Sequence, residues 1–293
     1  METQEIVVRF SEGNLLLLNF CLALIMFGVS LDLRPKDFKD ILTRPAPTIL
    51  GIVIQYLILP VLTLGIISEF QPAYGIALGI LLVMVSPGGN MSNFLTKIGK
   101  GDVPLSVALT AITTILSAFM TPLLFNLYSG FIDGEAEQLK SLDIWEMTLI
   151  VLQLTALPLL AGMAVNYYAP QLARRLEGPL KKGSLLIFFL FIIMAFIKNK
   201  EAFMNHIGLV FGLVAMVNAV ALGVGYFLPK LLKAGETQSR AISIEAGIKN
   251  SALSLVLVFN FWDGWGEPAL VAAWWGIWHL LSGFIIAIWW SKR

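Results

Sequence analysis

Hydrophobic residues in this chain form long runs, and polar residues are concentrated in the short segments between them. A helix needs about 20 mostly apolar residues to cross a bilayer. Nine runs meet that length, at residues 12–32, 46–68, 73–98, 103–128, 144–167, 184–201, 206–229, 239–262 and 268–290. The pattern predicts an all-α polytopic membrane protein with nine transmembrane helices and no separate soluble domain.

Composition agrees with that pattern. Hydrophobic residues make up 57% of the 293 positions and charged residues 13%, about half the ~25% typical of soluble domains. The net charge of +1 gives no reason to expect a nucleic-acid partner. One cysteine and two histidines exclude an internal disulfide and argue against a cysteine- or histidine-based metal cluster.

The basic residues predict the orientation in the membrane. With the N-terminus outside, fifteen of the 20 Lys and Arg residues fall at the inner ends of the runs and four at the outer ends. Such an excess marks the cytoplasmic side. We therefore expect a multi-pass protein with its N-terminus outside and its C-terminus in the cytoplasm. The remaining basic residue, Lys249, lies inside a run.

Two of the runs do not look like continuous helices. The third contains SPGGNMSN, from Ser86 to Asn93, where a proline and two glycines should interrupt the helix. The eighth contains EAGIKNSALS, from Glu245 to Ser254, with a carboxylate, an ammonium and an amide near mid-membrane. A charge at that depth costs at least about 2.5 kcal/mol, so these residues should face protein or a water-filled cavity.

Each interruption also has a purely structural explanation. The first could be a packing kink, and Glu245 and Lys249 could form an ion pair at i, i+4 on one helix face. However, the two runs are five apart in order and so cross in opposite directions. Paired broken helices in opposed halves are typical of inverted-repeat transporters, which bind substrates and ions where the helices are broken.

These residues resemble the bile acid:sodium symporter family. The segment from Ser86 to Leu124 is similar to the family's PGG-x-x-SN motif and the LSVALTA helix that follows it, and EAGIKNSALS is similar to E-x-G-x-Q-NS. MFGVSLDLRPKDF and WHLLSG also match family patterns, so that the resemblance extends from about Ile25 to Trp290.

The resemblance implies an inverted repeat with two crossing broken helices, divided into a core and a panel domain. Members with ten spans have one helix more at the start, so this chain is interpreted as a nine-span member. The panel would comprise residues 12–32 and 144–201, and the core residues 46–128 and 206–290.

The family's first sodium site maps onto five oxygen-bearing residues. They are Ser92, Asn93, Ser106, Thr110 and Glu245. One carboxylate with hydroxyl and amide oxygens suits a buried sodium ion, and Ser106 and Thr110 share a helix face. The alternative is that the two hydroxyls only bond backbone carbonyls of their own helix.

The second sodium site departs from the family pattern. It would use Gln55, Glu245 and the Gln of E-x-G-x-Q-NS, but Lys249 replaces that Gln. An ammonium here would repel sodium and pair with Glu245. The hypothesis is that Lys249 acts as a tethered cation and that one sodium ion at most is coupled. A buried lysine also loses its proton readily, which leaves proton-coupled or uncoupled transport open.

The substrate should bind where the broken helices meet the panel. Candidate residues for an anionic headgroup are Asn90, Asn250 and Ser251, with His279 lining the same cleft. The family's Asn after that His is Leu280 here, which leaves the substrate undefined. A satisfied core histidine is the alternative for His279.

The predicted function is secondary active transport of an organic anion, coupled to sodium through one site, by alternating access between core and panel. A sodium-independent or proton-coupled carrier, with Lys249 in place of the ion, is the alternative. An enzyme is not expected, because no activated nucleophile accompanies Glu245 and Lys249. A receptor with this fold would not need five sodium ligands, and a channel should show a ring of charges or a filter repeat.

Overall fold

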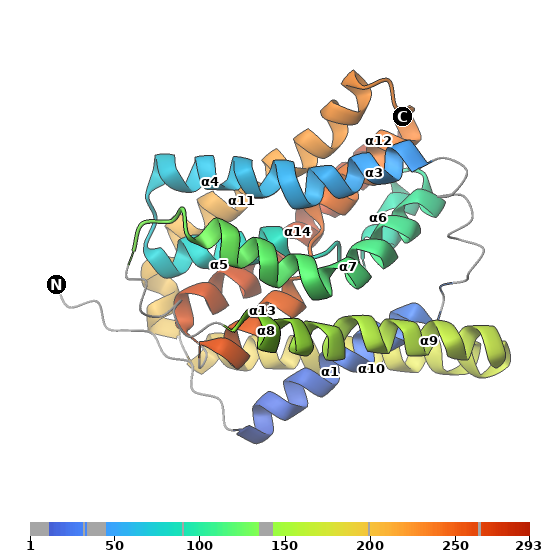
Figure 1. Ribbon diagram of the computed structural model, residues 1–293, viewed down its shortest axis with the longest axis horizontal. Helices are drawn as coiled ribbons and strands as arrows, with labels where there is room; N and C mark the ends of the chain where they lie inside the picture. The colour runs from blue at the N-terminus through green and yellow to red at the C-terminus, as the bar shows by residue number, and fades with distance from the viewer. Residues whose placement is uncertain are drawn as a thin grey trace.

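The computed structural model describes residues 12–31, 33, 45–89, 91–134, 143–198, 200–262 and 265–293, and this part of the chain is helical and has no β-strand. Figure 1 shows the helices, with η marking a π-helical turn. Their bounds are α1 (Glu12–Ser30), α3 (Pro45–Val53), η2 (Ile54–Ile58), α4 (Leu59–Phe70), α5 (Tyr74–Val85), α6 (Ser92–Ile98), α7 (Val103–Ser129), α8 (Ile144–Val151), η3 (Leu152–Ala156), α9 (Leu157–Tyr168), α10 (Pro170–Lys198), α11 (Lys200–Leu231), α12 (Glu236–Gly247), α13 (Ser251–Phe261) and α14 (Gly266–Ser291).

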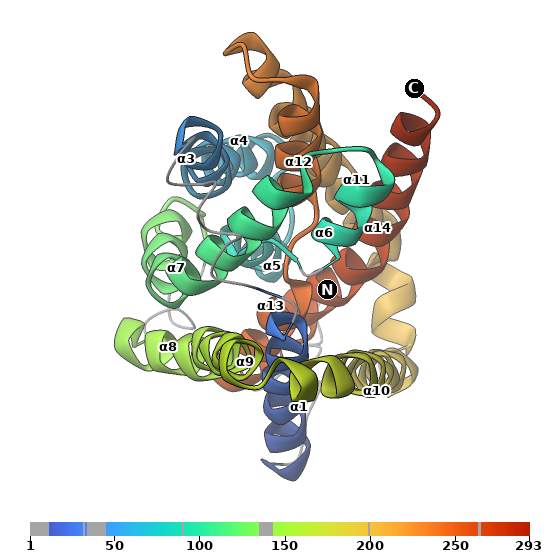
Figure 2. The same cartoon turned by 90° about the vertical axis from the view of Figure 1, so that its right-hand side faces the viewer.

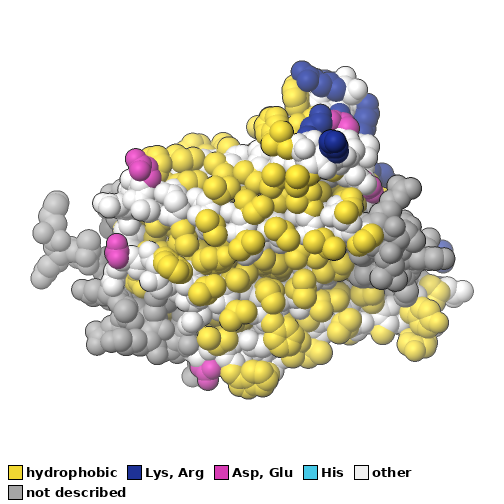
Figure 3. All heavy atoms as spheres, turned by 45° about the horizontal axis from the view of Figure 1, so that its top comes forward, with side chains coloured by type: hydrophobic (Ala, Val, Ile, Leu, Met, Phe, Trp, Pro, Cys, Tyr) yellow, Lys and Arg dark blue, Asp and Glu magenta, His cyan; other side chains and the backbone are white. Residues whose placement is uncertain are grey.

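The exterior is that of a membrane protein. Within the described residues, five segments are long and apolar enough to span a bilayer: Pro45–Phe70, Val103–Ser129, Ile144–Tyr168, Val210–Leu231 and Gly266–Ser291. Three shorter apolar helices lie at Leu15–Ser30, Tyr74–Val85 and Ser251–Phe261. Hydrophobic side chains cover the middle of the face seen in Figure 3, and basic side chains gather at one end. The all-α membrane fold is confirmed, and the count of nine crossings stays a prediction.

One predicted connection is helical. Residues 170–183 were expected to link two spans, but α10 begins at Pro170 and runs through them. Proline suits the first turn of a helix, where its missing N–H would have no partner. Two basic residues, Lys181 and Lys182, therefore lie on a helix and not in a loop.

Two of the spanning segments contain a π-helical turn ahead of a proline. In η2 the Leu59 N–H bonds Ile54 O, and in η3 the Leu157 N–H bonds Leu152 O. Pro60 and Pro158 follow directly and lack the N–H that would continue an α-helical ladder. A π turn places one extra residue in the helix at this point. In η2 that turn carries Gln55, which is buried.

The helices form two groups. Helices α1, α9 and α10 contact one another, and Figure 2 shows them with α8 along one side of the molecule. Helices α3, α4, α5, α6, α7 and α12 lie above that row, and α13 runs down from the centre to contact α1. Most buried side chains of both groups belong to one large hydrophobic cluster.

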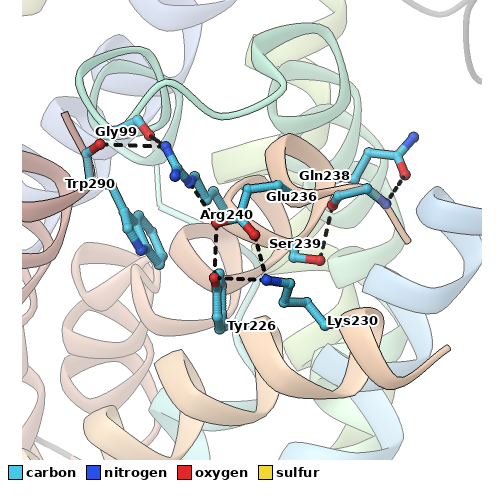
Figure 4. Close-up of polar contacts among 9 residues, drawn as sticks. Gly99, Tyr226, Lys230, Glu236, Gln238, Ser239, Arg240 and Trp290 are labelled. Carbon is cyan, nitrogen blue, oxygen red and sulfur yellow. Dashed lines mark hydrogen bonds and ion pairs between the residues drawn. The ribbon is translucent and has the colours of Figure 1, made fainter. Parts of the chain in front are cut away.

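A charged network fixes the start of α12 (Figure 4). Glu236 accepts from Lys230 at 2.6 Å and from Arg240 at 3.0 Å. The Arg240 guanidinium also donates to Gly99 O at 3.0 Å and lies over the Trp290 ring. One arginine thereby ties α12 to the ends of α6 and α14.

This network predicts a small stabilising effect that is lost at low pH. Hydrogen bonds, chiefly from Lys230, lower the pKa of Glu236 from 4.5 to about 2. Its stabilisation should be complete above pH 4.5 and lost as the pH falls toward 2. We expect Glu236→Gln to lower the melting temperature slightly at pH 7, because the pair is partly exposed, and to have no effect near pH 2.

Thermal unfolding in detergent across this pH range measures the effect. The control is Glu69→Gln at the exposed end of α4, which should not change the melting temperature at either pH. If Glu236→Gln lowers the melting temperature by the same amount near pH 2 as at pH 7, the electrostatic explanation is wrong.

Candidate functional site

The two interrupted spans cross each other at their breaks. The chain leaves α5 at Val85 and re-enters a helix at Ser92, and it leaves α12 at Gly247 and re-enters at Ser251. Between these helices Gly88 and Lys249 form an antiparallel bridge. The Gly89 N–H donates to Ile248 O at 2.6 Å, and the Asn250 N–H donates to Pro87 O at 2.9 Å. The predicted crossing of two broken helices is therefore confirmed.

Glycine is required on one side of this crossover because the two segments approach so closely. A Cβ at Gly88 would overlap the Glu245 carboxylate, and a Cβ at Gly89 would lie 2.7 Å from Lys249 O. The PGG sequence thus serves two purposes. Proline ends α5, and the glycines let the second broken helix come within main-chain bonding distance.

The five residues of the predicted cation site lie together beside the crossover. Thr110 is at the centre, with Oγ1 3.1 Å from Ser92 Oγ, 3.2 Å from Asn93 Oδ1 and 3.0 Å from Glu245 Oε2. Ser106 completes the group by donating to Asn93 Oδ1 at 2.9 Å. Three elements contribute: α6 carries Ser92 and Asn93, α7 carries Ser106 and Thr110, and α12 carries Glu245.

The chemistry of this cluster suits a small hard cation. The atoms that could coordinate a cation are all oxygens, which such cations prefer. Glu245, which supplies the negative charge, is fully buried. Glu245 Oε1 has no hydrogen-bond partner in the described part of the chain. A buried carboxylate oxygen without a partner is costly, and a bound cation would supply the missing interaction. Thr110 also bonds Ser106 O at 3.0 Å, so the backbone bonding considered as an alternative occurs alongside the cluster.

Lys249 is nearby, but it is not paired with Glu245. Its ammonium donates to Gln55 Oε1 and to Ser86 O, both at 3.3 Å, and no ion pair within 4.0 Å joins it to Glu245 among the residues described. The i, i+4 argument fails here because α12 ends at Gly247, so that the two residues do not share a helix face. Gln55 Nε2 has no hydrogen-bond partner in the same region.

The structure places two of the four predicted substrate residues, Asn250 and Ser251, at the crossover, and Asn90 lies outside the described residues. Asn250 caps α13, with Oδ1 accepting from the Leu253 N–H at 3.1 Å, and its Nδ2 points to Met26 Sδ of α1 at 3.7 Å. Ser251 begins α13, and a Cβ at Gly276 of α14 would lie 2.9 Å from its hydroxyl.

His279 lies one turn beyond Gly276 on α14 and is buried. Its Nδ1 has no partner within the described ranges. The expectation that a core histidine would be fully satisfied is therefore not met at this nitrogen. His279 is therefore a buried imidazole with one nitrogen unpartnered among the described residues, on the helix whose Gly276 lies against Ser251.

Sequence reasoning missed several polar groups at the site. Thr96 donates to Ser106 at 3.2 Å and lies one helical turn after Ser92, a spacing that could have indicated it. The hydroxyl oxygens of Ser86 and Ser254 lie 2.8 Å apart across the crossover and share a hydrogen bond. That contact joins residues 168 positions apart, and neither spacing nor composition indicates it.

Known proteins are similar to this chain over much of its length. The profile described as the sodium bile acid symporter family matches residues 19–206. The chain is 32% identical to an uncharacterised sodium-dependent transporter, YocS, of Bacillus subtilis, over 93% of this chain and 82% of that protein. It is 30% identical to a probable chloroplastic sodium/metabolite cotransporter, BASS2, of Oryza sativa subsp. japonica, over 93% of this chain and 63% of the relative. The P3 protein of Bos taurus is 28% identical over 86% of this chain and 52% of its own length.

Crossing broken helices with a buried polar cluster at their meeting point are typical of membrane transporters. The profile match and the similarity to YocS are more specific. The chain belongs to the sodium bile acid symporter family.

Proposed function

We propose that this protein is a secondary active transporter that couples one sodium ion to the movement of a small organic anion. The observation that carries the proposal is the cluster of five oxygen-bearing residues around Glu245, whose Oε1 has no partner within the described residues. The names of two relatives, a sodium-dependent transporter and a probable sodium/metabolite cotransporter, support sodium as the ion. In this proposal Ser92, Asn93, Ser106, Thr110 and Glu245 bind it.

Lys249 takes the place of a second sodium ion in this proposal. Its ammonium already donates hydrogen bonds to two neutral oxygens, Gln55 Oε1 and Ser86 O. A further cation beside it would be repelled. Without bound ligands, Glu245 and Lys249 together carry no net charge, and one sodium ion with one monovalent anion would preserve that balance.

The anion would bind at the start of α13. A helix N-terminus favours negative charge, and within the described residues the side-chain amide of Asn250 donates through Nδ2 to the thioether of Met26. A thioether is a weak acceptor, so a carboxylate should displace it. Ser251, His279 and Asn90 are the other proposed contacts.

Alternating access would come from movement of one helix group against the other. In this proposal residues 12–32 and 144–201 form the panel, and residues 46–128 and 206–290 form the core. The grouping in Figure 2 supports the division. The proposed orientation has the N-terminus outside and the network of Figure 4 on the cytoplasmic side, in keeping with its Lys and Arg residues.

Uptake into proteoliposomes tests this function. Purified protein would be given labelled pyruvate, pantoate and taurocholate separately, with an inward sodium gradient or a matched potassium gradient. We expect sodium to raise the uptake of at least one monoanion at least tenfold. Uptake that is equal in both gradients would reject sodium coupling.

A second candidate function rests on Lys249 itself. If its ammonium replaces sodium altogether, the protein is a sodium-independent or proton-coupled carrier. In the same vesicles, a pH gradient would then drive uptake without sodium, or uptake would follow the substrate gradient alone.

A further inference from the structure

An amide pair joins the two helix groups away from the crossover. Asn19 of α1 donates through Nδ2 to Asn260 Oδ1 at 3.2 Å, and Asn260 Nδ2 donates back to Asn19 Oδ1 at 3.0 Å. The residues are 241 positions apart in sequence and both are partly buried. Asn260 also bonds Val256 O of its own helix at 2.7 Å.

This pair ends a seam between α1 and α13 that starts at the crossover. Met26 of α1 meets Asn250 at the beginning of α13, and Asn19, two turns earlier on α1, meets Asn260 near the end of α13. Asn260 lies ten positions after Asn250, which is about 15 Å at a helical rise of 1.5 Å per residue. The two contacts therefore join α1 to α13 both at the crossover and toward the end where α1 begins.

The seam lies between the groups that the proposed function requires to move. The inference rests on that function, because α1 belongs to the proposed panel and α13 to the proposed core. If the groups rock about the crossover, the seam must part to admit a solute from the side where α1 begins. The two hydrogen bonds between the Asn19 and Asn260 side chains must then break, whereas hydrogen bonds within either group stay intact.

We propose that the Asn19–Asn260 pair is a latch that holds the outer side of the transporter closed and sets the population of its outward-open state. Hydrogen bonds between amide side chains can also simply hold membrane helices together, and each adds a modest amount of stability. Such a bond within one rigid group would affect stability alone. A latch between two groups would change how often the seam opens.

Chemical labelling of a buried reporter distinguishes these roles. Cys21 is the chain's one cysteine, and Cys21→Ser makes the background free of thiols. Leu257→Cys supplies the reporter, since Leu257 is buried, lies on α13 and is three residues before Asn260 on the same helix face. A membrane-impermeant maleimide added to intact cells reaches this thiol only when the seam opens.

We expect Asn19→Leu to raise the labelling rate about five- to tenfold, the effect of losing two such hydrogen bonds. Asn260→Leu should give a similar increase from the other helix, and the double variant no more than either single change. Because the two substitutions are on different helices, each is an independent test if the other impairs folding.

The matched control is Thr121→Val. Thr121 of α7 is buried and donates to Val85 O of α5 at 2.9 Å, so this change removes a hydrogen bond between two helices of the proposed core. Its labelling rate should stay within twofold of the reference. Equal rates in Asn19→Leu and Thr121→Val, whether raised or unchanged, would overturn the latch.

The labelling experiment needs neither substrate nor a sodium gradient. A failure to find a transported anion would leave its result standing. Conversely, sodium-driven uptake with unchanged labelling in both asparagine variants would reject the latch alone.

Discussion

Glu245→Gln is expected to remove sodium binding almost completely. The carboxylate is the one acidic group of the five-residue cluster, and it is fully buried. Glutamine keeps the size and one acceptor oxygen but loses the charge that compensates a cation. We expect sodium affinity to fall at least about 100-fold, or about 2.7 kcal/mol, and sodium-driven uptake to be lost.

Thermal stability in sodium, potassium and choline buffers measures this effect without a substrate. The parent protein should be stabilised by sodium alone, in proportion to ligand occupancy, and Glu245→Gln should melt at one temperature in all three. Glu236→Gln, at the other end of α12, is the matched control and should retain the sodium effect. Sodium stabilisation that survives in Glu245→Gln would exclude this cluster as the sodium site.

Lys249→Gln is expected to convert the protein from one coupled sodium ion to two. Glutamine would restore the side chain that the family motif has at this position, next to Gln55 and Glu245. It would also remove a buried positive charge that repels a second ion. The Hill coefficient for sodium in uptake should rise from about 1 toward about 2, since it is bounded by the number of sites.

The same change should make transport sensitive to membrane voltage. One sodium ion with one monoanion carries no net charge, whereas two sodium ions with one monoanion carry one positive charge. An inside-negative potential of 100 mV, worth about 2.3 kcal/mol per charge, should therefore drive uptake by Lys249→Gln but not by the parent.

Lys249→Met separates the loss of charge from the gain of an oxygen ligand. It removes the ammonium without supplying an oxygen, so the Hill coefficient should remain near 1. If Lys249→Gln keeps both the parent's coefficient and its insensitivity to voltage, the tethered-cation hypothesis fails.

Much of the fold could be predicted from the hydrophobic pattern. Helices appear at each predicted run, and the two interruptions at Ser86–Asn93 and Glu245–Ser254 do break their helices. Proline and glycine act locally, so their effect is visible in sequence. The proximity of Ser92, Asn93, Ser106, Thr110 and Glu245 was predictable to the same extent, and their role as a sodium site stays a prediction.

Other features depend on contacts that sequence does not encode locally. The partner of Lys249 was predicted to be Glu245, but the helix ends between them and the ammonium turns to Gln55. At η2 and η3 the sequence shows an ordinary apolar helical pattern followed by a proline, and this pattern does not indicate a π turn. The Asn19–Asn260 pair joins two unremarkable amides 241 residues apart.

The bridge at the crossover uses main-chain atoms, through Gly89 to Ile248 and Asn250 to Pro87. These main-chain bonds do not use the side chains of Lys249 and Asn250, which instead donate to Ser86 O and cap α13. Their substitution should therefore alter the choice of ion or solute while leaving the crossing geometry intact. Such a separation of scaffold from selectivity would allow a lineage of these proteins to acquire new cargo through single amino-acid changes.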